Sequence, residues 1–178
     1  KLITNVLPEK GILFVTASGN KVDAEDLIAQ QIYLSEFGVS LNADQLRDLA
    51  IHNFYPAHLS TEKNGVITVT TTNGKAVAPT QNYSNSFTDL GVIADKVTKD
   101  SMQFQVPFAG MTDFISGSSF ATAIATGVIG AYCEKAFYVP GLKKKKFIDH
   151  LLSLGNITVQ AVLEPKFIRK GAVTKKVV

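Results

Sequence analysis

The sequence has few of the residues that cross-link small folds. It contains one cysteine, Cys133, three histidines and no tryptophan. A single thiol excludes an internal disulfide framework and a zinc site with two thiolates from one chain, so Cys133 is interpreted as a small core residue. With 178 residues, 46% of them hydrophobic, the chain can bury a core without such links.

A strong charge excess and a long apolar run are also missing. Lys and Arg number 18 against 15 Asp and Glu, a net charge of +3, which is too small to indicate a nucleic-acid partner. Residues 121–132 form the best apolar run, but it falls short of the roughly 20 residues that span a bilayer. We therefore expect neither nucleic acid nor a membrane span. The first residue is Lys1 rather than Met, so we expect a piece of a longer polypeptide, in which a missing targeting signal excludes nothing.

Strand and helix signals alternate along the chain. Continuous apolar or β-branched runs predict buried strands at 11–16, 65–72 and 90–94. Helical spacing and capping residues predict helices at 1–10, at 23–37, from 42, at 119–137 and from 143 to about 154. This alternation predicts an α/β fold with a mostly parallel sheet flanked by helices.

Several segments have a less direct interpretation. The helix over 119–137 is made of small apolar residues all round, which predicts a buried, central helix. Polar residues 79–89 predict a surface loop, and Lys143 to Lys146 predict a solvated helix start or, alternatively, a patch for anionic surfaces. On helix 23–37, Ala24, Leu27, Ile28, Ile32 and Tyr33 fall on one side, with Asp23 as the cap. A turn at 73–74, a strand at 102–108 and one or two strands within 157–178 complete the predictions.

Three segments in order carry motifs. Residues 11–20, which include the first predicted strand, end in Ala-Ser-Gly-Asn; Phe-Tyr-Pro-Ala at 54–57 precedes Gly-Val-Ile-Thr-Val-Thr at 65–70; and Ser-Gly-Ser-Ser-Phe-Ala-Thr-Ala-Ile-Ala-Thr-Gly lies at 116–127 and opens a helix. Together they resemble the subtilisin-like serine proteases (subtilases), with their Ala-Ala-Gly-Asn, Tyr-Pro-Ala…Val-Ile-x-Val and Gly-Thr-Ser-Met-Ala-x-Pro motifs. The resemblance covers about residues 1–155, and looser matches lie at 83–87 and 92–95. Phe120 stands for the family's Met and Ala123 for its Pro, which indicates a divergent branch.

The resemblance implies roles for seven residues. Ser119 would be the nucleophile, with Ser118 in place of the usual Thr, and Asn20 would donate its amide to the oxyanion alongside the Ser119 N–H. The pocket for the residue before the scissile bond would be formed by Ala17, Ser18 and Gly19, while Gly117 lets substrate backbone approach. A serine at the start of an apolar helix suits this chemistry, because free N–H groups and the positive helix end stabilise a developing anion. Taken alone, however, each motif also fits a helix cap or a turn.

Two members of the catalytic triad are missing from the matched region. In subtilases the chain order is Asp, His, Ser, and His52, His58 and His150 do not fit the His motif. We therefore expect residues 1–178 to be the C-terminal portion of one catalytic domain, whose preceding part supplies Asp and His. The expected partners are that part and a peptide substrate. Within this domain, 21–53 would be a helical insertion and 157–178 the C-terminal strands.

The function expected from these motifs is that of a serine endopeptidase acting through an acyl-enzyme. One alternative is a catalytically inactive subtilase fold that binds or supports other molecules. Another is an unrelated doubly wound α/β domain that holds a small anion at the Gly117 helix start, although no G-x-G-x-x-G or Walker pattern supports it. The resemblance implies a secreted or cell-envelope location and no cofactor; relatives often bind calcium, but the acidic residues define no ligand set.

Overall fold

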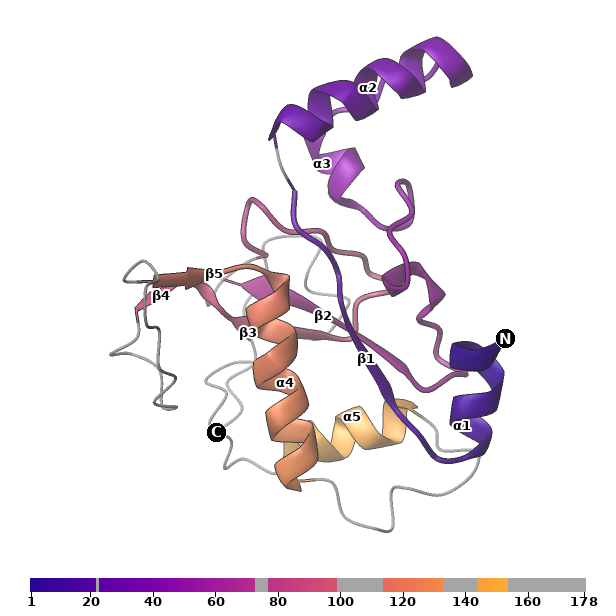
Figure 1. Cartoon of the computed structure of the whole chain (residues 1–178), viewed down its shortest axis with the longest axis vertical. Coiled ribbons are helices and arrows are strands. Elements are labelled where there is room, and N and C mark those ends of the chain that lie inside the picture. Colours follow the sequence, from indigo (N-terminus) through magenta and orange to yellow (C-terminus); the bar gives the residue numbers. More distant parts are fainter. Residues whose placement is uncertain (22, 73–76, 99–113, 133–143, 154–178) are drawn as a thin grey trace.

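A parallel three-stranded sheet lies at the centre of the structure, a computed structural model that describes residues 1–21, 23–72, 77–98, 114–132 and 144–153 (Figure 1). Its order is β1 (Phe14–Ala17), β2 (Val66–Thr72) and β3 (Leu90–Ile93). Phe14 pairs with Val66, and Val69 pairs with Leu90. The three predicted strands and the α/β arrangement are confirmed, with β1 starting at Phe14 rather than Gly11.

Every residue of the central strand β2 is buried, including its threonines. Thr68 Oγ1 donates to the Ala57 carbonyl at 3.2 Å and Thr70 Oγ1 to the Asn82 carbonyl at 2.6 Å. Both acceptors belong to loops that cover the sheet, so these hydroxyls are buried with partners, as polar groups in a core must be.

The prediction of a surface loop at 79–89 is wrong. Most of its polar side chains are buried, namely Gln81, Asn82, Ser84, Thr88 and Asp89. They can be buried because they form hydrogen bonds with one another and with the nearby backbone. The Ser84 N–H, for example, donates to Thr88 Oγ1 at 2.9 Å. Polarity alone did not distinguish a solvated loop from a hydrogen-bonded one.

Helix α4 (Ser118–Tyr132) lies across the sheet (Figure 1). One side packs on the strands and is buried through Ala121, Ala125, Val128 and Ile129. The opposite side is exposed at Ser119, Ala123, Thr126, Gly127 and Gly130. The helix is confirmed over its described length, but the prediction of burial all round is wrong for the described chain, because the sheet covers only one side of the helix.

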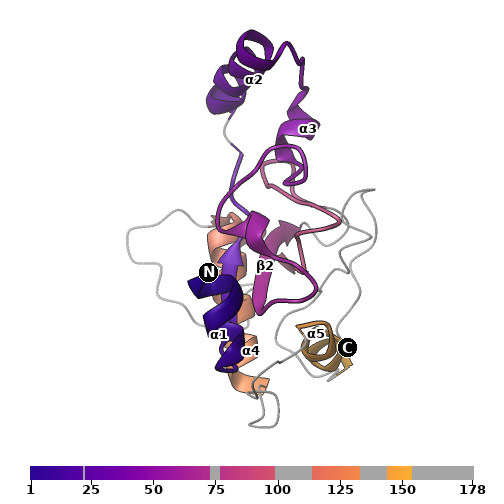
Figure 2. The same ribbon diagram turned by 90° about the vertical axis from the view of Figure 1, so that its right-hand side faces the viewer.

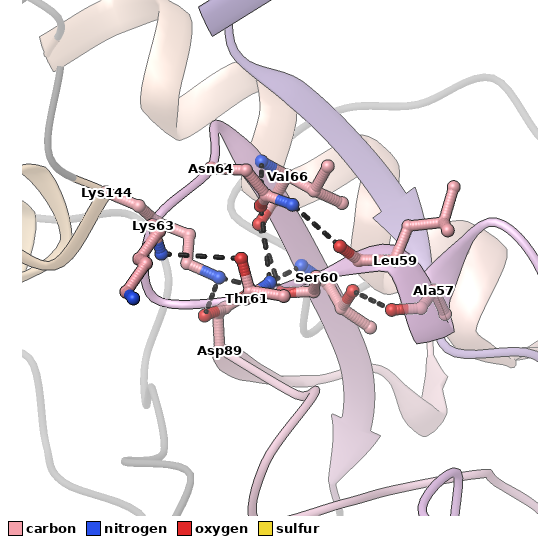
Figure 3. Close-up of polar contacts among 10 residues, drawn as sticks. Ala57, Leu59, Ser60, Thr61, Lys63, Asn64, Val66, Asp89 and Lys144 are labelled. Carbon is pink, nitrogen blue, oxygen red and sulfur yellow. Dashed lines mark hydrogen bonds and ion pairs between the residues drawn. The ribbon is translucent and has the colours of Figure 1, made fainter. Parts of the chain in front are cut away.

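Helix α5 (Lys144–Ser153) joins the same core through Phe147 and Ile148. Lys145 and Lys146 are exposed, as predicted for a solvated start, but Lys144 is buried and contradicts that prediction. Lys144 Nζ lies 2.8 Å from Asp89 Oδ1 and donates to Ser60 Oγ at 2.7 Å (Figure 3). The other Asp89 oxygen accepts from the Thr68 N–H at 2.8 Å. Burial raises the pKa of Asp89 despite the Lys144 charge and these hydrogen bonds.

The segment 21–53 lies at one end of the molecule, away from α5 (Figure 1). It forms α2 (Asp23–Phe37), with the predicted bounds, and α3 (Ala43–Arg47), which starts where predicted but ends before Leu49 and Ala50, the residues expected to continue it. Asn42 caps α3 through a reciprocal pair, in which Asn42 Oδ1 accepts the Gln45 N–H and Gln45 Oε1 accepts the Asn42 N–H. Tyr33 is half-buried, but the other large apolar side chains of α2 are exposed, namely Leu27, Ile28, Ile32, Leu34 and Phe37.

The remaining elements are short. A π-helical turn at Leu2–Val6 runs into α1 (Leu7–Glu9), as predicted for a helix closed near Pro8, and a 3₁₀ turn lies at Ala57–Leu59. Strands β4 (Asp95–Thr98) and β5 (Phe114–Ser116) pair antiparallel. The predictions at 73–74, 102–108, Cys133 and 157–178 lie outside the described residues.

Figure 2 shows α1 and α4 on one side of β2 and α5 on the other.

Candidate active site

The candidate site lies where β1 ends. Residues 18–20 follow this strand directly, and Asn20 meets the first turn of α4, 98 residues further along the chain. Asn20 Oδ1 accepts two hydrogen bonds from Ser118, from its N–H at 3.0 Å and its Oγ at 3.1 Å. Carboxyl ends of parallel strands are the edge at which α/β folds commonly bind ligands. The structure thus brings together Asn20, Gly117 and Ser118, three of the residues that the sequence analysis singled out.

The two serines that open α4 differ in their surroundings. Ser118 is 1% exposed, and its hydroxyl is bonded to Asn20. Ser119 is exposed. Since the first turn of a helix leaves N–H groups without intrahelical partners and carries partial positive charge, the exposed hydroxyl of Ser119 lies beside groups that favour an anion.

Glycine is required at two positions around this contact. Gly117 has φ of +123°, and a Cβ there would lie 3.2 Å from Asn20 Oδ1. Gly19 has φ of +95°, and a Cβ there would lie 2.8 Å from both Asn82 Nδ2 and the Phe54 ring. Both conformations are strained for other residues, so Gly117 permits the close approach of Asn20 to α4, and Gly19 permits that of Asn82 and Phe54.

The predicted pocket residues form the end of β1. Ala17 is half-buried and pairs with Val69. Ser18 is fully buried: its N–H donates to the Val69 carbonyl at 2.8 Å, and its carbonyl accepts from Asn82 Nδ2 at 3.1 Å. Within the described residues its hydroxyl has no hydrogen-bond partner.

Two side chains at this site were missed from the sequence. Gln81 Oε1 accepts the Ser118 N–H at 2.7 Å, so this amide hydrogen lies between Gln81 and Asn20. Phe54 borders Gly19. Nothing in the sequence singles out Gln81 within a polar run, whereas Phe54 directly precedes the Tyr-Pro-Ala motif.

The described histidine side chains bond elsewhere. His52 Nδ1 lies 3.2 Å from Tyr33 Oη, and His58 Nδ1 lies 2.9 Å from the Leu49 carbonyl, with its ring against Phe87. The His150 side chain is outside the described set. In the part of the chain that the structure describes, no three His, Cys, Asp or Glu residues are grouped to hold a metal ion.

Comparison with known families identifies the class of protein. The model of the subtilase family matches residues 3–153, which is most of the chain, and the chain belongs to this family of peptidases. The search of curated proteins finds no significant match. Subtilases are commonly secreted proteins. Over the described residues, no helix has the length and apolar character needed to cross a bilayer.

Proposed function

We propose that this chain carries the nucleophile and the oxyanion-binding groups of a subtilisin-type serine endopeptidase. The observation that supports the proposal is the contact between Asn20 and Ser118 in the first turn of α4, since Ser118 directly precedes the exposed Ser119. A nucleophile next to preorganised N–H donors is what acyl transfer requires.

In the proposed reaction, Ser119 Oγ attacks the peptide carbonyl carbon, and its proton passes to a general base. The carbonyl oxygen becomes an oxyanion held by the Ser119 N–H and Asn20 Nδ2. Because Asn20 Oδ1 already accepts from Ser118, the amide is turned so that its Nδ2 group remains as the donor. The C–N bond then breaks, the amine takes the proton, and water hydrolyses the acyl-enzyme.

The general base is proposed to be a His, oriented by an Asp, both from a part of the domain that precedes Lys1. His52 and His58 are engaged away from α4, which supports an outside source for the base. The exposed side of α4, with Ala123, Gly127 and Gly130, offers small residues against which such a part can pack. β1 is also at the edge of the described sheet.

The proposed substrate is a peptide or protein. Ala17, Ser18 and Gly19 would line the pocket for the residue before the scissile bond, and Gly117 and Ser118 would border the substrate backbone. The mechanism uses side chains and backbone N–H groups without a cofactor. A secreted or cell-envelope location fits a peptidase of this family.

Active-site labelling tests the proposal. The protein, together with its preceding part, is treated with a fluorophosphonate and its intact mass is measured. We expect one phosphonyl adduct on Ser119, none in Ser119→Ala, and an adduct still on Ser119 in the matched control Ser118→Ala. A folded, complete protein that takes up no adduct would instead be an inactive subtilase fold with a binding or structural role.

A further inference from the structure

Arg47, at the end of α3, reaches the loop between β2 and β3. Its Nε donates to the Gln81 carbonyl and its Nη2 to the Ala78 carbonyl, both at 2.9 Å. The guanidinium also lies over the Tyr83 ring, 5.3 Å from the centroid. The Arg47 side chain is only 12% exposed, so these bonds are largely shielded from water and are stronger for it.

The backbone joins the same two segments. The Tyr83 N–H donates to the Arg47 carbonyl at 2.9 Å, and the Leu49 N–H donates to the Tyr83 carbonyl at 2.8 Å. The loop 78–83 is therefore fixed to the segment 21–53 by side-chain and backbone hydrogen bonds together.

On its other side, this loop contacts both halves of the candidate site. Gln81 Oε1 accepts the Ser118 N–H at the start of α4. The Asn82 N–H donates to the Gly19 carbonyl at 3.1 Å, and the loop and β1 also pair through Asn20 and Gln81. A continuous set of contacts thus runs from Arg47 to the residue before Ser119.

We propose that Gln81, held in place by Arg47, is a positioning residue for the reaction at Ser119. The inference rests on the proposed function. Gln81 and Asn20 share the Ser118 N–H, so Gln81 fixes where the first turn of α4 stands relative to the Asn20 amide. Gln81 touches no reacting atom in this scheme. Its loss lets Ser119 and the oxyanion donors shift, and small misplacements cost rate rather than substrate affinity. The segment 21–53 accordingly controls turnover from outside the site.

The test uses the complete protein and compares peptide hydrolysis and phosphonylation rates. Gln81→Met keeps the buried shape but removes the acceptor; we expect kcat and the phosphonylation rate to fall about 3- to 10-fold, the worth of one hydrogen bond, with KM nearly unchanged. Gln81→Glu restores an acceptor oxygen and should recover part of kcat. Arg47→Lys, which cannot keep the forked contact, should lower kcat in the same way.

Asp44→Asn is the matched control. Asp44 pairs with Arg47 at 3.2 Å on the exposed side, so this variant removes the negative charge beside Arg47 without changing the loop, and wild-type kinetics are expected. If Arg47 acts through Gln81, the Arg47→Lys effect disappears in the Gln81→Met background. Additive effects, or wild-type kcat in Gln81→Met, would overturn the inference.

The failure of the proposed function has a different signature. If the proposed function is wrong, the wild type is not phosphonylated. If only the positioning role is wrong, the wild type is phosphonylated, and Gln81→Met and Arg47→Lys react at the same rate as the wild type. Amide hydrogen exchange gives a readout that needs no activity: we expect the Ser118 N–H to exchange faster in Gln81→Met than in wild type. Equal exchange would contradict the role of Gln81, even in an inactive protein.

Discussion

Lys144 and Asp89 form a buried ion pair that joins the start of α5 to the start of β3. Nζ and Oδ1 are 2.8 Å apart, and the two side chains are 4% and 11% exposed. Ser60 and the Thr68 N–H complete the polar shell of the carboxylate (Figure 3). Each charge is tolerated in this place because the other is present.

Removing one partner is expected to be costly. Lys144→Met leaves Asp89 buried without its cation, and should lower the free energy of unfolding by about 3–5 kcal/mol. Lys146→Met, an exposed position on the same helix, should change it by less than about 0.5 kcal/mol. Urea unfolding measures both. Adding Asp89→Asn to Lys144→Met should recover much of the loss; no recovery would mean that the pair is not the cause.

The raised pKa of Asp89, caused mainly by burial, gives a signed pH dependence. The folded state holds this proton more tightly than the unfolded state, whose carboxyl titrates near about pH 4. The contribution of Asp89 to stability is therefore full below about pH 4 and is lost as the pH rises through the folded pKa. The free energy of unfolding of wild type, relative to that of Asp89→Asn, should therefore decrease as the pH rises through the folded pKa of Asp89. A difference in stability that grows with pH would contradict it.

Asn20 Oδ1 accepts from Ser118, and its amide is proposed to donate to the oxyanion, so two variants should differ. Asn20→Asp keeps an oxygen for the Ser118 N–H and hydroxyl but loses the amide donor, and kcat should fall about 10²–10³-fold with Tm close to wild type. Asn20→Ala loses the acceptor as well and should also lower stability, by about 1 kcal/mol. Peptide hydrolysis and thermal unfolding separate the two effects. Full activity in Asn20→Asp would remove Asn20 from the oxyanion site.

Gly19 and Gly38 provide a matched pair of left-handed glycines. Gly38 has φ of +64° and open space around it, so Gly38→Ala should cost about 1–2 kcal/mol of conformational strain. Gly19→Ala adds contact with Asn82 and Phe54 and should cost about 3–5 kcal/mol. The midpoints of denaturant unfolding of the two variants, each relative to wild type, compare the two losses of stability. Equal losses would show that Asn82 and Phe54 yield to the new methyl group.

The strands could be predicted because their side chains report burial directly. Continuous runs at β1, β2 and β3 gave strand positions to within a few residues, and the Asn42 cap placed the start of α3. The burial of polar residues could not be predicted in the same way. Lys144 and Gln81 are hydrophilic on any scale. Each is buried with a partner that is distant in the sequence, Asp89 for Lys144 and Ser118 for Gln81.

The same distinction applies to the site. The motifs marked Asn20 at a strand end and Ser118 and Ser119 at a helix start, but the hydrogen bonds between Asn20 and Ser118 were not predicted. Gln81 and Phe54 could not, since their place depends on how the loops fold over the sheet. Which of the two serines is exposed, Ser118 or Ser119, follows from the tertiary structure and not from the local sequence Ser-Gly-Ser-Ser.

The contact between Asn20 and Ser118 spans 98 residues, which has a consequence for folding. A contact this distant in sequence forms only after the intervening chain has closed a long loop. An intermediate with β1 and α4 each formed but not yet docked would hold Ser119 without an amide beside it. In the reaction proposed here, the nucleophile and its oxyanion-binding amide are therefore brought together only when the tertiary structure is complete.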